Sequence, residues 1–163
     1  MHVEVLNHAL RNVPGDRVRM HVCWGNYEGP HTHDVPMEAI LSTVVRAKPR
    51  GLLFEGSNPR HAHEWRVFEA AAGDGTLPDD YTLIPGVIDS TTNFVEHPEL
   101  VAERIERFVG IVGADRVIAG TDCGFATFAG FGAVDAEIAW AKLGSLAEGT
   151  RLANERLAVP RAA

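Results

Sequence analysis

Four residues able to bind metals or protons recur along the chain at a constant spacing of 34 residues: His21, Glu55, Asp89 and Cys123. Each lies at or near the end of a short aliphatic run bounded by Gly, Pro, Asn or Asp, the pattern of a buried strand. A strand, a helix and their connections fit within one such repeat. The spacing therefore predicts that the chain repeats a βα unit.

The hydrophobic pattern predicts where the strands and helices lie. Strands are expected at 18–23, 51–55, 82–89 and 117–121. Apolar residues at helical spacing predict helices at 35–47 and 98–112, with a weaker one at 60–72. The polar segment 1–11 also reads as a helix, and the tail 135–157 as a helix that is broken near Gly144 or Gly149.

Strands that alternate with helices form a parallel sheet of βαβ units. Four such units make half of a (β/α)8 barrel, which takes about 250 residues in full. The predicted fold is therefore α/β: the C-terminal half of a (β/α)8 TIM barrel, with four parallel strands and their helices. It forms a single domain over residues 1–163, with a core at about 17–157. An open four-stranded α/β sheet is the structural alternative.

Composition narrows the partners of the chain. The 163 residues carry a formal net charge of -7, which disfavours nucleic acid and anionic membrane surfaces, since both attract basic proteins. No apolar run approaches the ~20 residues of a membrane span, and the N-terminus does not resemble a signal peptide. We expect a cytoplasmic protein with neither nucleic acid nor membrane as a partner.

The chain has two cysteines, Cys23 and Cys123. In a reducing cytosol they are expected to be thiols, with a metal or catalytic role, rather than a disulfide. The alternative is that both are small buried apolar residues. Along a strand, side chains two residues apart share a face, so His21 and Cys23 point together, away from Met20 and Val22.

Together with Glu55 and Cys123, this pair forms a candidate metal site at three strand ends. Barrel enzymes place their chemistry at the C-terminal ends of the strands. Two thiolates, an imidazole and a carboxylate suit tetrahedral Zn2+, whereas Mg2+ and Ca2+ prefer oxygen. Neither the H-x-C pair nor a single carboxylate is specific alone, so the prediction of zinc depends on their combination.

The chain resembles the C-terminal catalytic portion of cobalamin-independent methionine synthase and its shorter core-type relatives. Epoxyalkane:coenzyme M transferase is similar to it as a more distant cousin. The resemblance extends from Arg17 to about Leu157. The matching stretches are Met20-His-Val-Cys-Trp-Gly-Asn-Tyr-Glu-Gly-Pro30, Phe54-Glu-Gly-Ser-Asn-Pro59, Pro85-Gly-Val-Ile-Asp89 and Gly120-Thr-Asp-Cys-Gly-Phe125.

The resemblance implies a barrel whose catalytic zinc is held by His21, Cys23, Glu55 and Cys123. It also implies transfer of a methyl or alkyl group to a thiol, which is homocysteine in the synthases. The thiolate form of the acceptor would attack the electrophilic carbon. Glu55, the hardest donor, is the ligand that an incoming thiol would displace. A methyltetrahydrofolate is one candidate donor, but it cannot be assumed for the core-type relatives.

The chain departs from this family in two ways. A family barrel is roughly twice as long, which predicts a homodimer or a complementing N-terminal half. In the synthases, an aspartate is followed two residues later by a histidine in the third strand's loop. Here the matching run is Asp89-Ser90-Thr91, so Thr91 stands in the histidine's place. Proton delivery to a folate leaving group is therefore not implied.

Other polar residues follow the predicted strands. Asp89 is the candidate catalytic residue, either orienting a substrate amine or contacting His21, with a helix N-cap as the alternative. Asn26, Ser57 and Asn58 lie in loops where substrate contacts are common, and turn formation is their alternative role. Asp122 is expected to point away from Cys123 and to serve packing or hydrogen bonding.

Two H-x-H pairs, His31/His33 and His61/His63, suggest a different function. Such pairs occur in metal hydrolases, but the first pair follows Gly29-Pro30 in a loop, so we expect His31 and His33 to be solvated. Two functions therefore compete with zinc-dependent thiol alkylation. One is a non-catalytic zinc-binding half barrel that needs a partner, and the weaker one is a metal hydrolase.

Overall fold

A computed structural model gives the arrangement of residues 1–126, 132 and 134–158. Within these ranges, four parallel strands form one sheet in the order β1-β2-β3-β4. They are β1 (Arg19–Val22), β2 (Gly51–Phe54), β3 (Thr82–Ile88) and β4 (Gly120–Thr121). Strand order that follows chain order is the barrel pattern, because a doubly wound sheet reverses direction within the sheet. The predicted half barrel of four βα units is confirmed.

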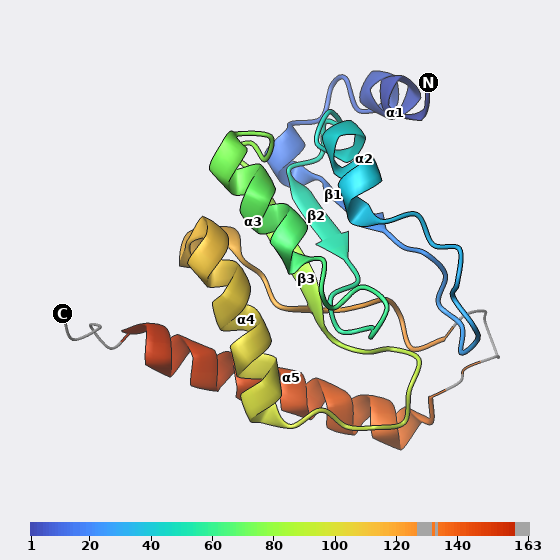
Figure 1. The fold of residues 1–163 in the computed structure, drawn as a ribbon, viewed down its shortest axis with the longest axis vertical. Helices are drawn as coiled ribbons and strands as arrows, with labels where there is room; N and C mark the ends of the chain where they lie inside the picture. The colour runs from blue at the N-terminus through green and yellow to red at the C-terminus, as the bar shows by residue number, and fades with distance from the viewer. Residues whose placement is uncertain (127–131, 133, 159–163) are drawn as a thin grey trace.

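Helices follow each strand. They are α2 (Met37–Val44), α3 (Trp65–Asp74), α4 (Pro98–Val112) and α5 (Ala136–Ala158), with α1 (His2–Ala9) before the first strand and short 3-10 turns at Gly15–Arg17 and Ala114–Arg116. Figure 1 shows α2, α3 and α4 along the same face of the sheet. Among the described residues, no helix is long and apolar enough to cross a membrane.

Local sequence explains where α4 begins and ends. Pro98 stands at its first position, and the side chain of the N-cap residue His97 accepts a hydrogen bond from the Glu99 N–H at 3.2 Å. Gly113 ends the helix with a φ of 87°, a conformation that glycine adopts without steric cost. The predicted boundaries of this helix are confirmed.

The core lies between the sheet and these helices. One cluster joins the outer face of β1 and β2 to α2, α3 and α4, with Phe54 stacked on Phe68 at 4.2 Å between ring centroids. A second cluster joins β3 to α4 and α5. On the opposite face of β1, Arg19 and His21 are exposed. The alternation predicted for this strand is therefore present, with its polar face directed toward what would be the barrel interior.

The predicted break in the last helix is wrong, because α5 runs continuously from Ala136 to Ala158. Gly149 is buried where α5 crosses α4. A Cβ atom there would come within 2.4 Å of Val101 Cγ1 and 2.8 Å of the Pro98 carbonyl oxygen. Gly149 therefore allows close helix packing, which local sequence cannot distinguish from a helix breaker.

Replacing the two glycines of α5 should give effects of opposite sign. Gly149→Ala should lower the free energy of unfolding by about 1–3 kcal/mol, because the methyl group has no space against Val101. Gly144→Ala, the matched control, should raise it by about 0.5–1 kcal/mol, since no atom would lie within 4 Å of its Cβ. Urea unfolding measures both. Equal stabilisation by the two variants would contradict the packing argument.

Candidate metal centre

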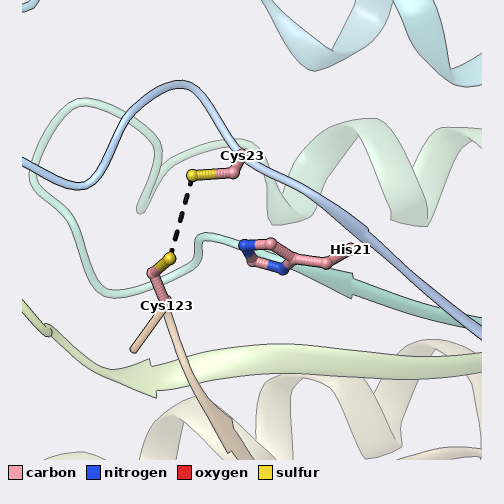
Figure 2. A group of neighbouring side chains, drawn as sticks. All are labelled: His21, Cys23 and Cys123. Carbon is pink, nitrogen blue, oxygen red and sulfur yellow. Dashed lines mark hydrogen bonds between the residues drawn. The ribbon is translucent and has the colours of Figure 1, made fainter. Parts of the chain in front are cut away.

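Three of the predicted ligands meet at the C-terminal end of the sheet. His21 lies on β1, Cys23 follows β1, and Cys123 follows β4. One ligand atom from each residue lies within 4.8 Å of the others. Figure 2 shows the three side chains directed toward a common centre, although they come from the first and last strands of the sheet. The prediction that these residues carry a metal stays a prediction.

The two sulfur atoms are 3.9 Å apart, although 100 positions in the chain separate the cysteines. In a flat sheet, strands three places apart would lie about 14 Å from each other, since neighbours are spaced about 4.8 Å. The side chains therefore meet because the sheet curves and both sulfurs lie on its concave side. This approach favours a barrel segment over the open four-stranded α/β sheet that the sequence left as an alternative.

Glu55 stands beside this group and is 4% exposed. Its Oε1 accepts a hydrogen bond from the Trp24 N–H at 3.1 Å, and its Oε2 accepts one from Asn58 Nδ2 at 3.2 Å. It is not among the three residues whose ligand atoms lie within 4.8 Å of one another. Glu55 is therefore the one predicted ligand outside this group of three, and both of its carboxylate oxygens accept hydrogen bonds from other residues.

The Cys23 thiol has a local environment that disfavours negative charge on its sulfur. Partial desolvation, with the adjacent Cys123 and Glu55 side chains, raises the pKa of Cys23 to about 11. The Gly25 N–H, which donates to Cys23 Sγ at 3.3 Å, works in the other direction. A cation between the sulfurs would reverse this balance, because a coordinated thiol loses its proton.

Asp122 connects two strand ends of the site. Its carboxylate accepts hydrogen bonds from three consecutive backbone N–H groups after β2: Gly56 at 2.8 Å and Ser57 at 2.9 Å on Oδ1, and Asn58 at 2.7 Å on Oδ2. The side chain is 3% exposed. The expected hydrogen-bonding role is confirmed. It fixes the residue before Cys123 against the loop after Glu55.

The predicted substrate residues also have protein partners. Asn26 Nδ2 donates to the Gly124 carbonyl oxygen at 2.6 Å, and Ser90 Oγ donates to Asn26 Oδ1 at 3.0 Å. Ser57 Oγ donates to the Gly86 carbonyl oxygen at 3.0 Å and accepts from Arg104. These bonds tie the loop after β1 to the segments after β3 and β4, and the loop after β2 to β3 and α4. They are contacts between distant segments, whereas the alternative role expected from the sequence was turn formation.

Asp89, the predicted catalytic residue, lies directly after β3 and is 6% exposed. Its Oδ1 accepts hydrogen bonds from the Thr91 N–H at 2.7 Å and the Thr91 hydroxyl at 2.8 Å. Its own N–H donates to Glu96 Oε1 at 2.8 Å, and Glu96 forms an ion pair with the fully buried Lys142 at 2.8 Å. Lys142 and Glu96 thus fix the backbone at Asp89. Local sequence does not reveal this pairing, because Lys142 lies 46 residues beyond Glu96 in the chain.

Fold and site together define a class: half of a (β/α)8 barrel with two thiols and an imidazole gathered at the C-terminal ends of its strands. No model of a protein family matches the chain. It is 30% identical to the 2-hydroxypropyl-CoM lyase of Xanthobacter autotrophicus over an alignment of 178 positions, which covers 96% of this chain and 46% of the lyase. It is 27% identical to the uncharacterized protein YxjG of Bacillus subtilis, over 88% of this chain and 37% of that protein.

The chain also matches two solved structures over most of its length. A B12-independent methionine synthase from Shewanella sp. W3-18-1, in complex with selenomethionine, matches with a TM-score of 0.74 and 19% identity, over 95% of this chain and 43% of that one. A putative vitamin-B12 independent methionine synthase from Listeria monocytogenes matches with a TM-score of 0.55 and 22% identity, over 94% of this chain and 39% of that one. The predicted resemblance is confirmed, and the chain spans less than half the length of these relatives.

The protonation of Asp122 should make stability depend on pH. Burial raises the pKa of Asp122 from 3.8 to about 7, while the N–H groups of residues 56–58 oppose that rise. The folded state therefore holds the proton more tightly. The resulting stabilisation is complete below about pH 4 and is lost as the pH rises to about 7.

Urea unfolding of the wild type and of Asp122→Asn between pH 5 and pH 8 measures this contribution. The difference in free energy of unfolding, wild type minus variant, should decrease as the pH rises. Asp115→Asn, at an exposed position before β4, is the control and should show no such trend. A difference that grows with pH would mean that the three N–H donors outweigh burial.

Proposed function

We propose that this chain is the zinc-binding part of an enzyme that transfers a methyl or alkyl group to a thiol. The observation that carries the proposal is the meeting of His21, Cys23 and Cys123 at the C-terminal ends of the strands. The names of two relatives, a B12-independent methionine synthase and a 2-hydroxypropyl-CoM lyase, support an enzyme of this class.

The donor atoms fit zinc. Thiolate and imidazole ligands favour Zn2+ over Mg2+ and Ca2+. With Zn–S bonds of about 2.3 Å at a tetrahedral angle, two sulfurs on one ion lie about 3.8 Å apart. The observed separation of the Cys23 and Cys123 sulfurs is 3.9 Å, so these two ligands are already at the distance that a shared ion requires. Glu55 would be the fourth ligand.

Bound zinc would lower the pKa of an acceptor thiol enough for it to be a thiolate at neutral pH. In the transfer, the thiol loses its proton, a bond forms between its sulfur and the donor carbon, and the bond from that carbon to its leaving group breaks. Asp89 at the end of β3 would orient the acceptor, and Asn26 would contact it from the loop after β1. Contacts from Ser57 and Asn58 to substrate stay predictions.

Both the acceptor and the donor would be small molecules. Homocysteine is one acceptor, as expected of a methionine-forming enzyme, and a methyltetrahydrofolate is one donor. Thr91 offers only a hydroxyl, which does not change its protonation state near neutral pH as an imidazole does. A donor whose leaving group needs no protonation therefore fits this site better than a folate.

The polar inward face of the sheet supports a second part of the proposal. Arg19 and His21 lie exposed on that face, and β1 is an edge strand that pairs only with β2 among the described residues. Matched relatives are more than twice as long as the segment they share with this chain. We propose that a second copy or a complementing N-terminal half covers this face. A zinc-binding half barrel without catalysis is the alternative function.

Metal content tests the site. Wild-type protein dialysed against zinc should retain about one ion per chain by mass spectrometry. Cys23→Ser and Cys123→Ser should weaken binding by more than about tenfold, because even changes in residues that support a ligand cost that much. His33→Ser, an exposed residue of the loop after β1, is the control. A wild type without zinc, or an equal loss in the control, would sink the proposal.

Completion of the barrel is tested by sedimentation and by turnover. The chain at micromolar concentration should sediment as a dimer, or bind a fragment of the lyase relative that holds the part it does not match. Zinc-dependent alkylation of a thiol should rise at least about tenfold when that fragment is present, since the positioning of substrates depends on both halves. A compact monomer that neither binds the added fragment nor gains activity from it would contradict this part of the proposal.

A further inference from the structure

The first members of the two H-x-H pairs meet at one carboxylate. His31 Nδ1 lies 3.1 Å from Asp34 Oδ2, and His61 Nε2 lies 3.2 Å from the same oxygen. The side chains of His31 and His61 are only 7% and 3% exposed. The prediction that His31 is solvated is therefore wrong, whereas His33 and His63 are exposed. The cluster of His31, Asp34, His61 and Glu64 is called the histidine–carboxylate cluster below.

His61 lies between two carboxylates. Its Nε2 faces Asp34, and its Nδ1 lies 3.1 Å from Glu64 Oε2. An ionised carboxylate only accepts hydrogen bonds, so a ring between two of them must donate from both nitrogens. In its protonated form, His61 donates to both carboxylates and its buried charge is balanced on both sides, which is the condition under which a buried charge is tolerated.

The cluster joins two loops of the fold. His31 and Asp34 belong to the loop between β1 and α2, whereas His61 and Glu64 belong to the segment between β2 and α3. Glu64 Oε1 also accepts a hydrogen bond from the Met37 N–H at 2.8 Å, at the first turn of α2. A carboxylate there is favoured by the helix dipole. The loop after β1 is thereby fixed at both its middle and its end.

Trp24 connects the cluster to the metal centre. Its ring stacks on the His61 ring, with 4.1 Å between centroids and 21° between planes. Its backbone N–H donates to Glu55 Oε1 at 3.1 Å, and its indole N–H donates to the Val35 carbonyl oxygen at 2.6 Å. Cys23 directly precedes Trp24, so the direction of its sulfur depends on how Trp24 is held.

We propose that His61 is a positioning residue, which locks Trp24 and the loop after β1 so that the Cys23 sulfur faces Cys123. The inference deepens the proposed function where it treats the two cysteines as ligands of one ion. The positioning role itself, in which His61 keeps the Cys23 and Cys123 sulfurs close together, does not depend on which ion binds there.

Several charged groups surround His61. Glu64 and Asp34 contact it, Glu55 lies nearby at the end of β2, and Arg60 and His63 line the same cavity of about 330 Å3. Desolvation lowers the pKa of His61, but the hydrogen bonds to Glu64 and Asp34 outweigh it and raise the pKa above its ordinary value. The stabilisation is therefore present in acid and is lost as the pH rises through the folded-state pKa.

His61→Phe separates the stack from the hydrogen bonds, because a phenyl ring can still lie against Trp24 but cannot donate to Asp34 or Glu64. His63→Phe, on the exposed second histidine of the same pair, is the matched control. Both variants are compared with the wild type by circular dichroism and urea unfolding, so that only folded protein is titrated. Asp34→Asn, which keeps the shape and removes one charge, is used if His61→Phe does not fold.

Two probes measure how the sulfurs are held. Co2+ reports through its thiolate charge-transfer and d–d absorption bands, and phenylarsine oxide reports without any metal, because its arsenic must bond to both thiols. His61→Phe should weaken the binding of both probes by about 10- to 100-fold, the usual effect of losing a residue that supports ligands. It should also shift the cobalt bands. The control should bind as the wild type does.

The outcomes separate this inference from the proposed function. Binding of both probes by His61→Phe at wild-type affinity, with an unchanged cobalt spectrum, would overturn the positioning role. A wild type that takes the arsenical but not cobalt would refute the proposed metal site. In that case the arsenical titrations alone decide the inference, since weaker arsenical binding by His61→Phe supports it and unchanged binding overturns it.

Discussion

Three consecutive backbone N–H groups converge on the carboxylate of Asp122, and the arrangement of the site depends on this contact. It ties the residue before Cys123 to the loop that follows Glu55, although the two segments come from strands that are not neighbours in the sheet. The curved sheet provides the approximate approach, and the N–H groups fix the distance. Ser57 and Arg104 extend the same connection toward β3 and α4.

Much of this arrangement could be predicted from the sequence. Aliphatic residues located the strands of the described sheet: β2 and β3 are largely buried, as parallel strands commonly are, whereas β1 carries its apolar residues on one face only. The regular spacing of His21, Glu55 and Cys123 predicted that all three lie at the C-terminal ends of the strands, since neighbouring parallel strands end on the same side of the sheet. For Asp122, alternation along the strand implied that it faces away from Cys123, and its buried hydrogen bonds agree with that.

Other features could not be read from local pattern. From the sequence alone, Gly149 is a candidate helix breaker, like any glycine in a helix. Only the crossing of α5 over α4 shows that this glycine allows the two helices to pack closely. His31 was expected to be solvated because loop residues generally are. In the structure its side chain is buried beside Asp34, which also contacts His61. Lys142 is also buried, which a polar pattern does not predict for a lysine in an amphipathic helix.

The two sulfurs come from the first and last strands of the sheet, so an ion shared between them would close a loop of 100 residues. A cross-link of that span stabilises the folded state by lowering the conformational entropy of the unfolded chain, by an amount that increases slowly with loop length. The ion would then stabilise the fold of the half barrel as a cross-link, in addition to activating the acceptor thiol. The melting temperature would rise with the concentration of free metal. A chelator would therefore lower both the stability of the sheet and the activity.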